Sequence, residues 1–349
     1  MIKPWVFEFV ETHEAADPLA FNGARAQEII AWKGDLWPDL ERRGFEGVFF
    51  SEHHFRPNGL CSSPNLFVAW LAARTTRLRL GVMGSVTPMH HPWRLAEEYS
   101  LLDQLSGGRM EFGFSSGIAV EAERVGVPRA ELRARFEEAL EIFQKATRQD
   151  AFSHEGRFWS FKDLRIVPRP LQADPPCWIT ATSASSAQFA ARKGYKLCTG
   201  FLPTEGVASL FDSYRNAASE AGRKASPDDL GLRRLVFIAD TDAAAERIGA
   251  AAATAMADRI RRSNERLAAQ RANQTTGHVP DAPASPRLNI HPDEQIFGSP
   301  STVAAKITEQ CRRVGAGHFL AYTIDTLTQE ETTRSFELWR DVAPELRRA

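Results

Sequence analysis

The chain has 349 residues, of which 43% are hydrophobic and 25% are charged, and its formal net charge at pH 7 is −1. This composition is typical of a globular protein with a large core, and the scattered Lys and Arg give no support for nucleic-acid binding. No apolar run is long enough to cross a bilayer, and the first residues do not resemble a secretory signal. We therefore expect a cytoplasmic protein without a membrane partner.

The first half of the chain predicts a repeated unit of strand, loop and helix. Short apolar runs alternate with segments of helical spacing. Such alternation indicates a parallel sheet, because parallel strands need a long crossover connection. The predicted strands are 4–10, 46–51, 78–84 and 109–114, and the predicted helices are 26–43, 64–74, 92–105 and 130–148.

The alternation is interrupted at residues 151–175, which contain three prolines and predict a short hairpin followed by a surface connection. Eight strands in all predict one domain spanning residues 1–349, an α/β fold of the (β/α)8 TIM-barrel type with insertions after strands four and seven. The later strands are predicted at 176–181, 195–200, 232–239 and 317–323, and the later helices at 184–193, 205–221, 242–272, 300–314 and 328–347.

The second insertion, residues 273–299, is rich in Pro, Asn, Asp and Gly and is too long for an ordinary connector. Its prolines argue against a regular helix or a central strand. Because it follows strand seven, it leaves the carboxyl-terminal mouth of the barrel, where active sites of this fold lie. We expect it to cover that mouth as a lid, and a loose surface excursion is the alternative.

Polar residues follow three of the predicted strands at the point where each strand ends. They are Glu52-His53-His54 after the second strand, Met83-Gly84-Ser85 after the third, and Ser115-Ser116-Gly117 after the fourth. In a closed parallel barrel these ends lie on one face, so residues distant in sequence should converge there.

His53 is the first candidate for chemistry. A histidine can act as acid, base or hydrogen-bond donor near neutral pH, and the adjacent Glu52 could fix its tautomer or raise its pKa. Adjacent residues of an extended segment point to opposite sides, so His53 and His54 should not both face the same cavity. The alternative is a polar loop that merely leaves the sheet.

Small hydroxyl residues between the fifth strand and its helix suggest an anion site. Hydroxyls and free backbone N–H groups at a helix start suit a phosphate, whereas a plain N-cap needs only one hydroxyl. The residues are Thr180, Thr182, Ser183, Ser185 and Ser186. Gly81 and Gly84, at the end of the third strand, would let a flat ligand approach or would permit a tight bend.

Several other site types lack their signatures. The chain has no GxGxxG dinucleotide motif, no Walker-type GKS or GKT, and no GxSxG nucleophile elbow. The histidines and the four cysteines show no metal-ligand spacing, so we expect reduced thiols and no metal.

Taken together, the motifs resemble the bacterial-luciferase-like flavin monooxygenase family, most densely over residues 46–117. The resemblance rests on Glu52-His53-His54-Phe55, Gly81-Val-Met-Gly-Ser-Val86, His91-Pro92-x-Arg94-x-Ala96-Glu97-Glu98, Leu102-Asp103-x-Leu105-Ser106-x-Gly108-Arg109 and Gly113-Phe-Ser-Ser-Gly117. It continues through Arg133-Ala-Arg-Phe-Glu-Glu-Ala139, the serines at 183–186, Phe297-Gly298-Ser299-Pro300 and Gly315-x-Gly317-His318-Phe319.

This resemblance implies an enzyme that binds FMN, usually as reduced flavin delivered by a separate flavin reductase. Reduced flavin would react with molecular oxygen to give a hydroperoxide, which would oxygenate a small, apolar organic substrate. A homodimer or another homo-oligomer is expected. The alternatives are a deazaflavin-dependent dehydrogenase on the same barrel and a non-catalytic flavin-binding relative.

The resemblance also implies roles for individual residues. His53, with Glu52 beside it, matches the histidine next to the flavin, and Met83-Gly84 matches a non-proline cis peptide beneath the flavin ring. The further residues implied at the cofactor are Ser115, Ser116, Arg133, Ala181, Thr182, Ser183, Ser185, Ser186 and Phe201. Two positions depart from relatives, since Ser116 stands where some carry a phosphate-binding arginine and Thr182 where bacterial luciferase carries a carboxylate.

Overall fold

The structure is a computed structural model that describes residues 1–12, 21–56, 58–274 and 290–349. Within these ranges, eight parallel strands form a closed barrel, which confirms the predicted (β/α)8 architecture. Closure is direct, because β1 pairs with β2 and with β12, while β10 pairs with β12 and with β9. In barrel order the strands are β1 (Lys3–Glu8), β2 (Gly47–Phe50), β3 (Arg79–Val82), β5 (Met110–Ser115), β8 (Cys177–Thr180), β9 (Lys196–Thr199), β10 (Leu230–Ile238) and β12 (His318–Thr323).

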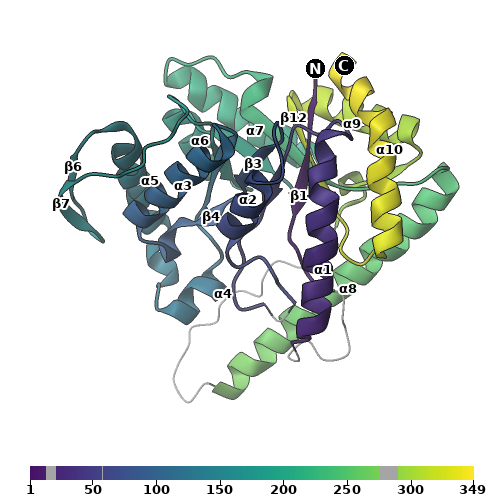
Figure 1. Ribbon diagram of the computed structural model, residues 1–349, viewed down its shortest axis with the longest axis horizontal. Helices are drawn as coiled ribbons and strands as arrows, with labels where there is room; N and C mark the ends of the chain where they lie inside the picture. The colour runs from purple at the N-terminus through teal and green to yellow at the C-terminus, as the bar shows by residue number, and fades with distance from the viewer. Residues whose placement is uncertain (13–20, 57, 275–289) are drawn as a thin grey trace.

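Helices surround the barrel, as Figure 1 shows. The first and last helices lie side by side, and the Trp32 indole N–H donates to the Thr333 hydroxyl at 3.3 Å. The helices are α1 (Gly23–Leu36), α2 (Pro64–Ala72), α3 (Pro92–Ser106), α4 (Ala119–Ala122), α5 (Leu132–Arg148), α6 (Ala184–Lys193), α7 (Thr204–Glu220), α8 (Asp242–Gln274), α9 (Pro300–Val314) and α10 (Gln329–Arg348). No described helix is both long and apolar enough to span a membrane.

Proline and glycine set several helix boundaries, as their backbone preferences predict. Helix α3 begins at Pro92 and is followed by Gly107 in the left-handed conformation. Helix α9 repeats the pattern with Pro300 and Gly315. The predicted helix at 26–43 is divided, because α1 ends at Leu36 and a 3-10 turn continues to Glu41.

Both insertions can be compared with their predictions. The first contains the expected hairpin, formed by antiparallel β6 (Phe152–Glu155) and β7 (Ser160–Leu164). In the second, residues 275–289 lie outside the described ranges, and so does the lid expected there. The prediction that 273–299 has no regular structure is wrong at its end, where β11 (Gln295–Gly298) pairs in parallel with the last part of β10.

The barrel interior is aromatic. Alternate residues of each strand point inward, so that Trp5 and Phe7 of β1 join Phe49, Trp178 and Tyr322 in one buried cluster. Large rings from several strands fill the lumen below the carboxyl-terminal mouth, and a ligand is therefore confined to the mouth itself.

Candidate active site

His53 lies just beyond β2, on an aromatic surface at the carboxyl end of the barrel. Its ring stacks on Phe9 with a centroid distance of 5.3 Å and an interplanar angle of 9°. The Nδ1 atom lies 3.1 Å from Glu121 Oε1, and the side chain is 24% exposed. His53 is therefore held in place on one side and accessible on the other.

The electrostatic surroundings favour neutral imidazole. Burial lowers the pKa of His53, and the nearby Arg56 acts in the same direction, while the Glu121 carboxylate opposes both. Burial alone would raise the pKa of Glu121, but its bond to His53 and the charge of Arg56 keep it lowered. An ionised Glu121 assigns the His53 proton to Nδ1, which leaves Nε2 as an acceptor.

Glu52 has different partners from those we predicted. It accepts hydrogen bonds from Nε2 of His54 and Nε2 of His90, both at 2.8 Å. Among the described residues it has no hydrogen bond to His53, and it acts on His53 only through its charge, which raises the His53 pKa. Burial favours the protonated acid, but these two histidines outweigh burial and lower the pKa of Glu52 to about 2. Glu52 therefore anchors the loop, and the carboxylate that orients His53 is Glu121.

Glu121 was missed in the sequence because it lies in α4, a single helical turn after β5. It is only 4% exposed, and its Oε2 atom has no hydrogen-bond partner within the described residues. The available signal was its place shortly after the Ser115-Ser116-Gly117 strand end, within an otherwise small and apolar stretch.

A hydroxyl-rich helix start forms a second part of the site, across the same face of the barrel. Ser183 caps α6, and its Oγ accepts from the Ser186 N–H at 3.4 Å. The Ser186 hydroxyl lies 3.1 Å from Ser183 Oγ and accepts from Arg133 Nη1 at 3.1 Å. Arg133 comes from α5, so two helices converge on one exposed cluster of donors, which suits a phosphate.

The other predicted cofactor residues lie beside the serine cluster or at the end of β5. Ser185 lies 3.3 Å from Ser183, hydroxyl to hydroxyl, and Thr182 is exposed beside them. The Ala181 N–H is used inside the sheet, where it donates to the Cys198 carbonyl at 3.1 Å. At the end of β5, Ser115 Oγ accepts from the Gly117 N–H at 2.9 Å, and Ser116 is half-buried.

The Met83–Gly84 peptide bond is cis, as predicted. The two glycines of this strand make room for protein atoms. A Cβ on Gly84 would lie 2.5 Å from the Phe114 backbone, and one on Gly81 would lie 2.5 Å from the Phe49 ring. Close packing against the neighbouring strands accounts for both glycines, and this is neither of the two interpretations offered for them, a flat ligand or a tight bend.

Phe201 follows β9 and joins the aromatic surface. It meets Tyr322 edge to face at 6.5 Å, and Tyr322 lies 4.9 Å from Phe9. A continuous row of rings therefore runs from Phe201 to His53 around part of the mouth.

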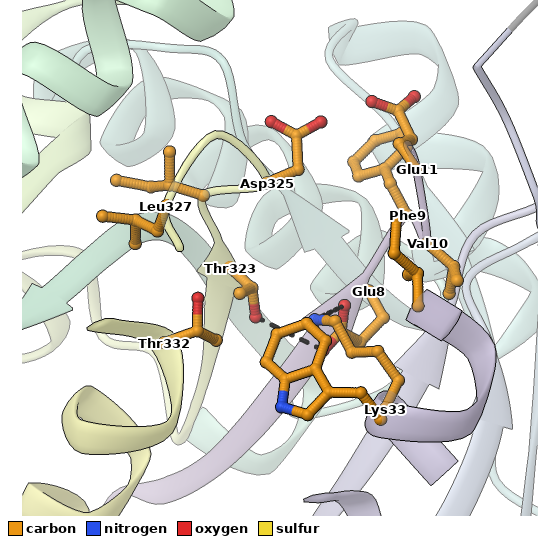
Figure 2. Close-up of a pocket in the computed structure, with 12 residues that line it drawn as sticks. Glu8, Phe9, Val10, Glu11, Lys33, Thr323, Asp325, Leu327 and Thr332 are labelled. Atoms are coloured by element: carbon orange, nitrogen blue, oxygen red, sulfur yellow. Dashed lines mark hydrogen bonds and ion pairs between the residues drawn. The ribbon is translucent and has the colours of Figure 1, made fainter. Parts of the chain in front are cut away.

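A small cavity lies behind this row, between α1 and the β12–α10 connection (Figure 2). Glu8 closes it from below through a 2.8 Å ion pair with Lys33, and Glu11 and Asp325 lie at its upper edge. Phe9 lines the cavity and also stacks on His53. The cavity therefore lies outside the barrel wall, and the predicted cofactor residues take no part in it.

Comparison with known proteins gives matches over most of the fold. The family described as luciferase-like monooxygenase matches residues 20–318. The oxygenase component of a flavin-dependent trigonelline monooxygenase from Acinetobacter baylyi is 30% identical over 214 residues, which cover 60% of this chain and 59% of that protein. The chain thus spans about three fifths of the length of this curated relative.

Two solved structures resemble the whole chain. Monooxygenase RslO1 from Streptomyces bottropensis has a TM-score of 0.79 at 25% identity, with 97% of this chain and 98% of that chain covered. The oxygenating constituent of 3,6-diketocamphane monooxygenase from Pseudomonas putida, in complex with FMN, has a TM-score of 0.78 at 22% identity, covering 99% and 98%. With a family match that spans residues 20–318, the chain belongs to the luciferase-like monooxygenase family.

Proposed function

We propose that this protein is the oxygenase of a two-component system, which binds reduced FMN and transfers one atom of molecular oxygen to a small organic substrate. The observation that carries the proposal is the pairing of two features at one end of the barrel. One is the donor cluster of Ser183, Ser186 and Arg133, and the other is the neutral, oriented imidazole of His53.

The donor cluster fits the FMN phosphate. It combines two hydroxyls, a helix N-terminus and a guanidinium, all of which favour a multiply charged oxyanion. Arg133 is partly neutralised by Glu137 on its own helix, and its ring contact with Phe189 at 4.7 Å holds the guanidinium near Ser186. We propose Ser115, Ser116, Thr182 and Phe201 as further neighbours of the cofactor.

When bound, reduced FMN supplies the two electrons that activate oxygen. The chain's own residues would then orient the reactants and control one proton. His53, with Nδ1–H donated to Glu121, presents Nε2 as an acceptor and can take a proton or hold a donor at that atom. Phe9 fixes the ring plane by stacking, and the aromatic row excludes water from one side of the mouth.

A separate flavin reductase would supply the reduced cofactor. The support is that the trigonelline relative is named an oxygenase component, which implies a second component in that system. The chain also lacks a dinucleotide-binding motif for a nicotinamide reductant of its own.

The test supplies the protein with reduced FMN and molecular oxygen enriched in oxygen-18, together with a panel of aromatic, terpenoid and aliphatic substrates. Oxygen uptake and the label in the product are measured. The proposal predicts a product that carries one labelled atom and whose amount matches the oxygen consumed. Oxygen-independent hydride transfer with a deazaflavin, or flavin binding without any turnover across the panel, would contradict it.

A further inference from the structure

Arg233 places a guanidinium inside the barrel near its carboxyl-terminal mouth. It comes from the middle of β10, and its guanidinium carbon lies 4.0 Å from the ring centroid of Phe201, 4.7 Å from Phe7 and 5.7 Å from Tyr322. Phe201 follows β9, and Phe7 and Tyr322 are near the ends of β1 and β12, so the charge is held at the level of the mouth.

This guanidinium differs from two other arginines of the barrel wall, Arg79 and Arg234. Arg79, at the opposite end, is paired with Glu111 and bonds Gln172 at 3.2 Å. Arg234 points out of the barrel and donates to Gln310 at 2.8 Å and to the Leu202 carbonyl at 3.1 Å. For Arg233, the described ranges contain neither a hydrogen bond nor an ion pair of the guanidinium. It lies against three ring faces and against Gly200, where an added Cβ would be 2.6 Å from the Arg233 Nε.

Within the part of the chain that the structure describes, the charge is therefore left without a counter-ion. Burial lowers the pKa of Arg233, but an arginine stays charged in proteins. The Cys198 thiol and the Tyr322 hydroxyl are neutral, since burial raises both pKa values. The Glu294 carboxylate acts on Arg233 only through space, is bonded to the His291 N–H at 3.3 Å, and has its own pKa raised by burial. A buried charge is costly unless it is paired, and ring faces compensate only in part.

We propose that Arg233 binds an anionic head group of the organic substrate, such as a carboxylate or a sulfonate. The planar fork of a guanidinium matches such groups through two parallel hydrogen bonds. The apolar part of the substrate would lie along the row formed by Phe201, Tyr322 and Phe9, which ends at His53. This inference rests on the proposed function, because it assumes that the substrate occupies the mouth beside His53.

The test is equilibrium binding of matched carboxylate and amide pairs by calorimetry, with no turnover required. The probes are acetate and acetamide, benzoate and benzamide, and octanoate and octanamide, each titrated into the protein with and without FMN. For at least one pair we expect the wild-type protein to bind the carboxylate at least about tenfold more tightly than the amide, the effect of one charge-assisted hydrogen bond. Equal binding of both members in every pair would overturn the proposal, whatever any variant does.

Variants then assign the preference to one residue. Arg233→Met, which keeps an unbranched side chain and removes the charge, should abolish the preference while leaving amide binding unchanged. Arg233→Lys should keep part of it, because charge remains but the planar fork is lost. The control is Arg124→Met, which removes an exposed charge that donates to the Phe55 carbonyl at 3.2 Å, and it should retain the full preference. A preference that survives Arg233→Met in a folded protein would overturn the assignment.

The reduced flavin ring is also a delocalised anion and could pair with Arg233 in place of the substrate. Titration with reduced FMN distinguishes the two ligands. We expect Arg233→Met to bind reduced FMN as the wild type does. A variant that loses affinity for reduced FMN but keeps the carboxylate preference would overturn the proposal in favour of a flavin contact. If the protein prefers carboxylates but forms no labelled product, the proposed oxygenase is refuted and the Arg233 site stands. If it forms labelled product but shows no preference for carboxylates, the Arg233 site is refuted and the proposed oxygenase stands.

Discussion

His53 Nδ1 lies 3.1 Å from Glu121 Oε1, although the two residues are 68 positions apart in the chain. His53 follows β2 and Glu121 follows β5, and barrel closure brings these two strand ends to one face. The contact fixes the ring tautomer, so Nε2 is the nitrogen that remains available for chemistry.

Glu121→Gln should lower the pKa of His53 further, because the carboxylate is the main group that opposes burial there. A hydrogen bond to a charged group is stronger than one to a neutral group by about 1–1.5 kcal/mol, so turnover should fall roughly tenfold when the charge is removed. Titration of the His53 ring protons by NMR, followed alongside the pH–rate profile, checks both. An unchanged His53 titration would show that Glu121 has no such role.

His53→Ala should impair turnover far more than His54→Ala. Loss of a proton-transfer group typically costs ~10²–10⁴-fold in rate, whereas His54 is bonded to Glu52 and takes no part in the aromatic row. Flavin binding by both variants should be compared first, so that a lower rate caused by weaker flavin binding is recognised. Equal rate losses in the two variants would refute the assignment of His53.

Arg133→Met should weaken binding of FMN but not of riboflavin, which lacks the phosphate. A hydrogen bond to a charged group contributes about 1.5–3 kcal/mol, so the FMN dissociation constant should rise by about 10- to 100-fold. Arg135→Met is the matched control, because Arg135 lies on the same helix and is paired with Glu131 instead. If FMN and riboflavin are affected alike, the phosphate is held elsewhere.

The interaction of Glu52 with His54 and His90 predicts a pH window for stability. The lowered pKa of Glu52, about 2 against a usual 4.5, contributes stability on the order of 3 kcal/mol that is present above pH 4.5 and is lost as pH falls towards 2. The raised pKa of His90 contributes stability that is present below pH 6.5 and is lost as pH rises through its higher folded value. The contribution of the pair is therefore largest between about pH 4.5 and 6.5.

Urea unfolding at pH 3 and pH 5.5 tests this window. The wild type should lose more unfolding free energy between the two values than Glu52→Gln, while the exposed control Glu123→Gln should behave as the wild type. Parallel losses in Glu52→Gln and wild type would contradict the assigned role of Glu52.

The strands and helices could be predicted because local patterns determine them. Period-2 apolar runs such as Trp5-Val-Phe7, and helix starts at Pro92 and Pro300, recur in the structure within a few residues. The strand β11 could not be predicted from the sequence. Its four residues follow a proline-rich segment and are stabilised by pairing with β10, a contact between distant segments.

The candidate site was predictable where a motif is contiguous and not where it depends on tertiary contacts. The serines at the start of α6 form a local motif, and the cis Met83–Gly84 bond was implied by the family resemblance of a contiguous motif. The partner of His53 could not be predicted in this way. Glu52 is adjacent in sequence but is bonded by His54 and His90, whereas Glu121 comes from α4, in the connection after β5. Arg233 was likewise hidden in an ordinary strand pattern, since only the closed barrel brings its guanidinium against Phe201 with no ion pair among the described residues.

Anaerobic titration of the protein with reduced FMN, and in parallel with NADH, tests the central claim most directly. The chain offers a phosphate cluster at α6 but no dinucleotide motif, so the predicted result is saturable binding of reduced FMN that is much tighter than any binding of NADH. Micromolar binding of NADH, together with no binding of FMN in either redox state, would contradict the account.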